Sequence, residues 1–259
     1  MASEGVSPHK DPAGRRIYSW LAFHDLESRR KAKNPWLHMT RDGGPAQLIG
    51  CVLGSAGYSP GPIIFNYPGH DFGESDPSLF DRRELLLVTT RPPLDPYPRK
   101  RIDCSNSPLE RKIFCSFRRF FAYCSRDTVE LTCSVEQALS PNKKYLARID
   151  FDVFLSGSRA DDPSQTDQRG QSLGYMVSTV AAWPDGPRLL AAFSTAGTES
   201  LAWGYILTTK HRELLERAMN SDRDMIAIGE FTLPNAHLDR RGSLRFLDEV
   251  DSVVTVCEL

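Results

Sequence analysis

Two apolar runs in residues 173–194, separated by the segment Trp-Pro-Asp-Gly-Pro at positions 183–187, constrain the fold of this chain more than any other feature. Proline presets the backbone angle that the first position of a tight turn requires, and glycine readily accepts a positive φ. Short apolar runs that flank such a turn are typical of paired strands. The segment therefore predicts an antiparallel hairpin, with Gly186 at the positive-φ position.

Other short apolar runs lie between glycine and proline residues and also predict strands. They cover residues 17–23, 46–53, 62–67, 84–90, 128–134, 145–155, 225–233 and 252–258. Two segments instead repeat apolar residues at steps of three and four, which predicts helices over 109–124 and 198–219. We expect Asn220 to end the second helix in a left-handed conformation.

Because the predicted strands outnumber the predicted helices, we expect an α+β fold. Its sheet is expected to be mixed and mainly antiparallel, with the helices packed on one face. The alternative is a Rossmann-like α/β fold. At 259 residues the chain is close to the limit of about 250–300 residues that one hydrophobic core can serve, so residues 16–259 are predicted to form a single domain.

Three segments are expected to lie outside regular structure. Residues 1–15 contain two prolines and no apolar periodicity, which predicts a flexible N-terminal tail. Four prolines in 91–101 predict a connection without helix or central strand. Residues 157–171 are polar, which predicts a mobile loop.

The overall charge gives no preference for nucleic acid or anionic lipid, since 32 basic residues face 33 acidic ones. The sequence has no run of the roughly 20 apolar residues that a membrane-spanning helix needs. Its first residues also lack the apolar segment of a secretory signal. We therefore expect a soluble, cytoplasmic protein with no membrane partner and with reduced cysteines.

Asp150 and Asp152 are candidate metal ligands. Residues two apart on a strand project from the same face, and paired carboxylates suit Mg²⁺ or Mn²⁺. Such an ion could activate a phosphoryl group. The same alternation also arises when a strand simply leaves its polar face in water.

His70 and Asp71 lie in a glycine-rich loop that follows a predicted strand. A rigid strand can position such a loop for chemistry, and an adjacent carboxylate can orient an imidazole as a proton acceptor. The alternative is a surface turn in which aspartate and glycine only satisfy the turn geometry.

Glu199 lies where residues 194–200 join a predicted strand to a predicted helix. The free N–H groups of a helix start can bind phosphate. Glu199 already supplies negative charge there, which disfavours phosphate unless a metal ion intervenes. The alternative is a structural helix start, with Thr198 as the N-cap.

A basic segment that follows the proline-rich residues 91–101 offers a different kind of site. The predicted helix would carry four basic side chains on its solvent-exposed face, opposite its phenylalanines: Arg111, Lys112, Arg118 and Arg119. Such a surface could bind RNA or an acidic protein partner. Nucleic acid is the less favoured partner, because the overall charge is not positive.

These patterns lead to one main hypothesis and one alternative. The chain is expected to be an enzyme acting on a small or phosphate-bearing molecule, with a divalent ion at Asp150 and Asp152. Its catalytic residues would be His70, Asp71, Asp150, Asp152 and Glu199. The alternative is a non-catalytic module that uses the basic helix over residues 109–126 to bind its partner.

Overall fold

The computed structural model describes residues 10–22, 35–65, 80, 84–89, 108–125, 128–131, 148–150, 171–194, 197–233 and 245–259. The strands are β1 (Arg16–Ala22), β2 (Tyr58–Phe65), β3 (Leu85–Val88), β4 (Phe121–Ser125), β5 (Thr128–Leu131), β6 (Arg148–Asp150), β7 (Gln171–Thr179), β8 (Arg188–Ser194), β9 (Met225–Thr232) and β10 (Ser252–Glu258). The helices are α2 (Pro35–Ser55), α3 (Pro108–Phe117), α6 (Gly197–Thr209), α7 (Arg212–Asn220) and the 3-10 helix η6 (Arg245–Glu249).

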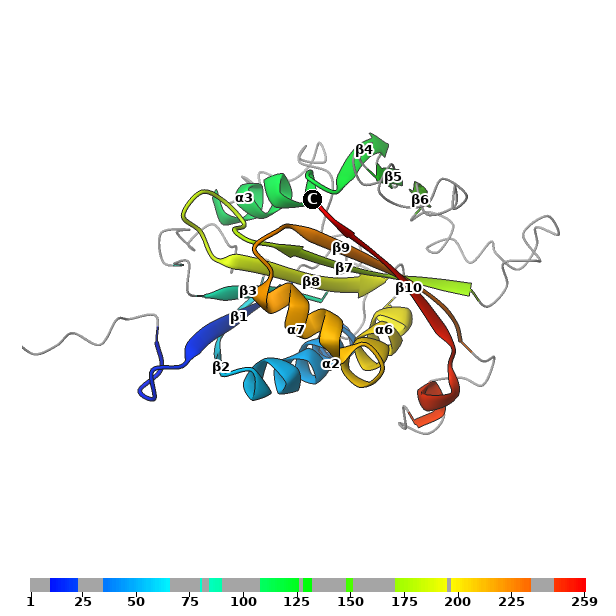
Figure 1. Cartoon of the computed structure of the whole chain (residues 1–259), viewed down its shortest axis with the longest axis horizontal. Helices are drawn as coiled ribbons and strands as arrows, with labels where there is room; N and C mark the ends of the chain where they lie inside the picture. The colour runs from blue at the N-terminus through cyan, green and yellow to red at the C-terminus, as the bar shows by residue number, and fades with distance from the viewer. Residues whose placement is uncertain are drawn as a thin grey trace, which may run out of the picture.

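A mixed seven-stranded sheet in the order β10-β9-β7-β8-β3-β1-β2 forms the centre of the fold (Figure 1). Strands β2, β1, β3 and β8 pair in parallel, whereas β8, β7, β9 and β10 pair antiparallel. A mixed sheet is thus confirmed, but the expectation of a mainly antiparallel one is wrong. The crossover through α2 makes β1 and β2 parallel, as in the Rossmann-like alternative. Strands β4, β5 and β6 form a second, antiparallel sheet.

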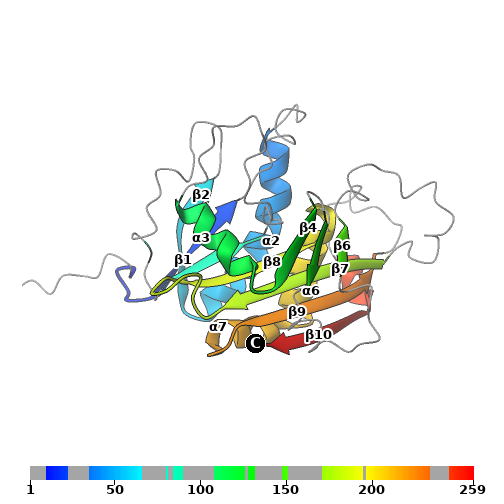
Figure 2. The same cartoon turned by 90° about the horizontal axis from the view of Figure 1, so that it is seen from above.

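Helices cover both faces of the large sheet, which corrects the prediction that they pack on one face. Helices α2, α6 and α7 lie on one side, and α3 lies on the other with β4 to β6 (Figures 1 and 2). Leu109, Ile113 and Phe117 of α3 belong to the same buried cluster as Phe193 of β8. Because this apolar stripe packs on the face that α6 does not cover, both faces of β8 are buried.

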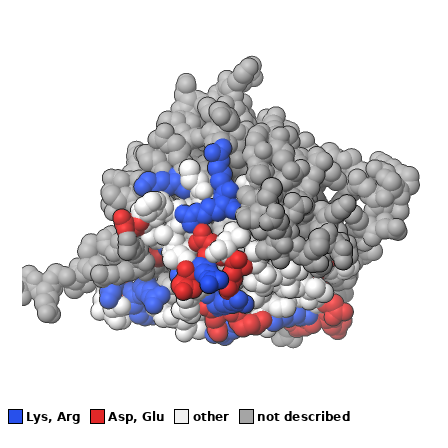
Figure 3. Space-filling model, turned by 45° about the horizontal axis from the view of Figure 1, so that its top comes forward, with Lys and Arg blue, Asp and Glu red and all other residues white. Residues whose placement is uncertain are grey.

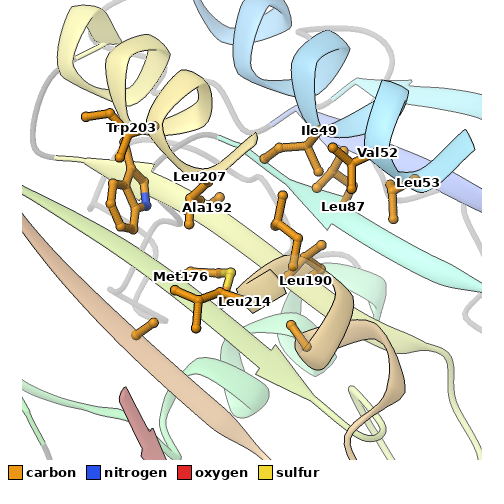
Figure 4. Packing of buried hydrophobic residues seen from close by; sticks show 14 of the residues in the cluster. Ile49, Val52, Leu53, Leu87, Met176, Leu190, Ala192, Trp203, Leu207 and Leu214 are labelled. Atoms are coloured by element: carbon orange, nitrogen blue, oxygen red, sulfur yellow. The ribbon is translucent and has the colours of Figure 1, made fainter. Parts of the chain in front are cut away.

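Helix α2 replaces the strand predicted over residues 46–53. Its glycines and Pro45 resemble helix breakers in the sequence, but Gly44 and Pro45 lie where α2 meets α6. A Cβ added at Gly44 would lie 2.7 Å from Leu201 Cδ1, and one added at Gly204 would lie 3.1 Å from Pro45 Cα. The small residues therefore permit close helix packing, and the resulting core overrides local propensity (Figure 4).

The helix predicted over 198–219 is divided into α6 and α7 between Thr209 and Arg212. Asn220 does not adopt the expected left-handed conformation: it is the last residue of α7 and has no positive φ, and Ser221 after it is extended, with φ −61° and ψ 144°. The Asn220 side-chain amide donates to Glu216 O at 2.8 Å, and the Ser221 N–H donates to Arg217 O at 2.7 Å. These two hydrogen bonds satisfy the carbonyl groups at the end of α7. In a helix with a left-handed C-terminal residue, backbone N–H groups satisfy such carbonyls instead.

The predicted hairpin is confirmed as the antiparallel pair β7 and β8. Its turn is closed by a 2.9 Å bond from the Gly186 N–H to Trp183 O. The positive φ of 63° belongs to Asp185 and not to Gly186, which corrects the expectation. Gly186 is required for space, since an added Cβ would lie 2.5 Å from the Trp183 ring.

The predicted helix over 109–124 ends early, at Phe117, and β4 begins at Phe121. A turn separates them, in which the Phe120 N–H donates to Phe117 O at 3.0 Å. Phe121 then packs edge-on against Tyr175, with ring centroids 6.1 Å apart. This contact holds the start of β4 against the large sheet.

Candidate functional site

Three buried serines, Ser172, Ser194 and Ser200, lie where β8 ends and α6 begins. Strand β8 ends at Ser194, and its partner in β7 at this point is Gly174. The carboxyl ends of β1, β2 and β3 lie at the same edge of the sheet, because these strands run parallel to β8. Open sheets with parallel strands commonly bind ligands outside this edge.

Glu199, in the first turn of α6, accepts a hydrogen bond from one serine hydroxyl and lies beside a second. Ser172 Oγ of β7 donates to Glu199 Oε1 at 3.2 Å. Ser194 Oγ lies 3.4 Å from Glu199 Oε2 and also donates to Leu173 O at 2.5 Å. The two serines are only 4% and 2% exposed, whereas Glu199 is half-buried. The carboxylate is therefore fixed from within the protein and still reaches solvent.

The start of α6 supplies electrostatic support for this carboxylate. Glu199 is the third residue of the helix, where the helix dipole favours a negative charge. Ser200 Oγ accepts the Ser194 N–H at 2.9 Å, which ties the helix start to the end of β8. An isolated phosphate would meet the Glu199 carboxylate at this position, so the site favours a cationic or hydrogen-bond-donating group.

Tyr175 of β7 projects from the other face of the sheet, into the buried cluster that includes α3. Its ring is fully buried and stacks on Phe193, with centroids 5.6 Å apart. Its hydroxyl has no hydrogen-bond partner among the residues that the structure describes. Burial raises the pKa of this phenol, and the Glu199 carboxylate raises the pKa further. Tyr175 therefore stays protonated as a hydrogen-bond donor.

The structure fixes the side-chain surroundings of one catalytic candidate, Glu199. The backbone of Asp150 lies at the end of β6, where Asp150 pairs with Thr128 in the small sheet. That sheet is on the α3 side, whereas Glu199 is on the α6 side (Figure 1). The fold therefore does not bring these two residues together. His70, Asp71 and Asp152 lie outside the described residues.

Sequence reasoning missed Ser172, which donates to Glu199, and also Ser194 and Ser200, which join the end of β8 to the start of α6. Serine at the end of a strand is common, so its type alone carries no signal. The available signal was the register of the predicted hairpin, which brings the start of β7 beside the end of β8. In the described parts of the chain, no three His, Cys, Asp or Glu side chains gather in a group that could hold a metal ion.

The basic helix is largely engaged within the fold. Lys112 Nζ lies 5.2 Å from the centroid of the Trp183 ring, and Arg119 Nη1 lies 2.6 Å from Asp224 Oδ2. Arg118 is exposed, and the side chain of Arg111 lies outside the described residues. Figure 3 shows basic and acidic side chains side by side on this surface. The described surface is thus mixed in charge.

The chain matches no protein-family model, and neither a curated protein nor a solved structure is detectably similar to it. None of the described helices is long and apolar enough to cross a membrane.

Proposed function

We propose that the protein is an enzyme that acts on a small molecule at the sheet edge beside Glu199. The observation that carries this proposal is the carboxylate itself, to which Ser172 Oγ donates at 3.2 Å while Glu199 remains partly exposed. A carboxylate held in this way is preorganised to accept a proton from a bound substrate. Glu199 is thus the proposed proton acceptor.

The chemistry of the site narrows the proposed substrate class. Ser172 Oγ donates to the carboxylate, whereas the single proton of Ser194 Oγ is directed to Leu173 O, so a substrate hydroxyl or ammonium group would act as a further donor to Glu199. A phosphate-bearing substrate would need Mg²⁺ or Mn²⁺ between its phosphate and Glu199. We therefore favour a substrate that presents a hydroxyl or ammonium group.

His70 and Asp71 remain part of the proposal as proton-transfer groups. Strand β2 ends at Phe65, at the same sheet edge as Ser194, and His70 follows five positions later. Divalent metal binding by Asp150 and Asp152 is a separate prediction, and the Glu199 site does not depend on it. A cytoplasmic location likewise remains a prediction from the sequence.

The test compares the wild-type protein with Glu199→Gln, which keeps the shape of the side chain and removes its charge. Each protein is incubated with a small-molecule extract of cells, and mass spectrometry identifies compounds consumed and formed. We expect turnover with the wild type and a loss of about 100-fold or more in the variant, the scale of general-base catalysis. Glu213→Gln is the matched control, because Glu213 is exposed on α7.

Two outcomes would contradict the proposal. Equal turnover by the wild type and Glu199→Gln would exclude Glu199 as the proton acceptor. Absence of any turnover in the wild type would remove the enzyme proposal and leave the binding module as the alternative. That alternative is less favoured, because Lys112 and Arg119 already contact Trp183 and Asp224.

A further inference from the structure

The two edges of the seven-stranded sheet differ in their capacity to pair with another strand. Edge strand β2 contains Pro60 and Pro62, which have no backbone N–H to donate. Edge strand β10, with the sequence SVVTVCE, contains no proline, glycine or basic residue. Proline and basic residues usually protect an edge strand from pairing with another strand, and β10 has neither. Among the described strands, β10 pairs only with β9, and it lies at the outer margin of the sheet (Figure 2).

The register of β10 defines which of its backbone groups face outward. The Leu259 N–H donates to Asp224 O at 2.8 Å. Along an antiparallel strand the N–H and C=O of alternate residues point to the same side. Thr255 and Cys257, opposite Ile228 and Ile226, therefore face β9. The backbone groups of Val254, Val256 and Glu258 consequently point away from the sheet.

The side chains of this edge are also suited to a protein neighbour. Val253 is 60% exposed, the largest exposed fraction among the large hydrophobic residues that the structure describes. Val254 and Val256 are half-buried against the cluster on the α6 side. Four β-branched residues in succession, from Val253 to Val256, favour an extended strand that buries both faces.

We propose that β10 pairs antiparallel with β10 of a second copy of the chain, about a twofold axis at Thr255. In this register Val254 faces Val256 of the other copy, and Val253 faces Cys257. Both pairs are apolar, and such cross-strand pairs stabilise sheets. Twofold dimers with self-complementary surfaces are the most common symmetric oligomers.

The charges of β10 do not oppose its pairing with a second copy. Glu258 is the one charged residue of β10, and it faces Ser252 in the twofold register. Its carboxylate is already neutralised by Arg217 Nη2 at 2.5 Å within the same chain. No like charges within β10 therefore oppose each other. Strand pairing alone buries less than the roughly 1,200 Å² of a stable interface, so the dimer should dissociate on dilution.

The first experiment measures the mass of the full chain in solution by sedimentation velocity over a wide range of protein concentration. We expect the 29.1 kDa chain to shift toward twice its mass as concentration rises. Val253→Lys places a charge on the pairing edge and should abolish the shift. The matched control is Ile63→Lys, which changes an equally exposed apolar residue on β2 and should leave the shift intact. Circular dichroism melting verifies that both variants fold.

The second experiment tests the register. At a twofold axis Thr255 faces itself in a non-hydrogen-bonded pair, where Cα atoms lie about 4.5 Å apart, within the range of a disulfide. Under mild oxidation Thr255→Cys should form a covalent dimer that reductant reverses. Val254→Cys, which faces Val256, should form no more than the wild type, in which Cys51 and Cys115 are also exposed.

Three results would overturn the dimer. They are a wild type that remains at 29.1 kDa at every soluble concentration, a shift that persists in Val253→Lys, and equal cross-linking of Thr255→Cys and Val254→Cys. The first result would leave the edge free for a strand of another protein. None of them bears on the turnover measured with Glu199→Gln, because Glu199 is not a residue of β10.

Discussion

Gly174 of β7 lies directly opposite Gly229 of β9, and the indole ring of Trp203 covers both. A Cβ added at either glycine would lie 2.2 Å from a Trp203 ring carbon. The indole is fixed by a 3.1 Å bond from Nε1 to Tyr175 O and by stacking on Phe231, with the ring planes 2° apart. The two glycines thus form the floor on which α6 packs.

We predict that Gly229→Ala destabilises the protein by about 1–3 kcal/mol, the usual cost of overpacking a buried site. The ring of Trp203 is fully buried and hydrogen-bonded, so it cannot move away cheaply. Urea unfolding followed by circular dichroism measures the loss. An unfolding midpoint equal to that of the wild type would show that the close approach is not required.

Gly54→Ala is the matched control for that experiment. Gly54 lies in α2, and an added Cβ there meets nothing within 4 Å. Replacing a helical glycine by alanine usually stabilises by about 0.5–1 kcal/mol, because the unfolded chain loses freedom. The two substitutions should therefore shift the midpoint in opposite directions.

The strands of the fold were more predictable than its helices. The β7 and β8 hairpin and strand β10 follow from local patterns, because turn residues and β-branched runs act over short distances. Helix α2 could not be predicted in this way. Gly44 and Pro45 disfavour a helix locally, and their contact with Leu201 and Gly204 of α6 explains why they are tolerated.

The candidate site was predictable in one residue and not in its surroundings. Glu199 follows from a strand-to-helix junction, which is a local pattern. Ser172, which donates to Glu199, is 27 positions away from it in the sequence. The start of β7, which carries Ser172, lies beside Ser194 only because β7 and β8 pair in one register. Convergence with Asp150 was expected, but that residue belongs to the small sheet on the other side.

A double-mutant cycle should show that Ser172 supports Glu199. Ser172→Ala and Glu199→Ala each remove one partner of the 3.2 Å hydrogen bond. We expect an interaction energy of about 0.5–1.5 kcal/mol, the net value of one such bond. The double variant should therefore lose less stability than the sum of the singles, as measured by urea unfolding.

Glu216 of α7 provides the control pair for this cycle. Its carboxylate bonds to Arg212 Nε at 2.9 Å, and Ser172 bonds to neither residue. Ser172→Ala and Glu216→Ala should thus be additive within about 0.3–0.5 kcal/mol. Additivity of the Ser172 and Glu199 pair as well would remove the serine from the proposed site.

Asp11 should titrate well below an ordinary aspartate. Its Oδ2 accepts a 2.5 Å bond from Ser59 Oγ, and the backbone and side chain of Arg15 also donate to its carboxylate. The Ser59 bond is the largest cause that lowers its pKa from 3.8 to about 2. Because the folded-state pKa is depressed, this stabilisation is complete above pH 3.8 and is lost as pH falls toward 2.

Carbon NMR of the Asp11 carboxyl group measures this pKa directly. Ser59→Ala removes the strongest bond and should raise the midpoint toward the unfolded value of 3.8. Ser55→Ala is the control, since its hydroxyl bonds to Cys51 O at 3.0 Å and is remote from Asp11. A wild-type midpoint at 3.8 would be inconsistent with the turn as described.

The described cysteines should differ sharply in reactivity. Cys51 and Cys115 are exposed, whereas Cys257 is buried. Burial and the Glu258 carboxylate both raise the pKa of Cys257. Each unit of that rise lowers the thiolate fraction about tenfold below the pKa, and only the thiolate is alkylated.

Peptide mass mapping after iodoacetamide treatment should find Cys51 and Cys115 modified first. In urea, where burial is lost, Cys257 should react as they do, and equal rates in the native protein would contradict its placement on β10.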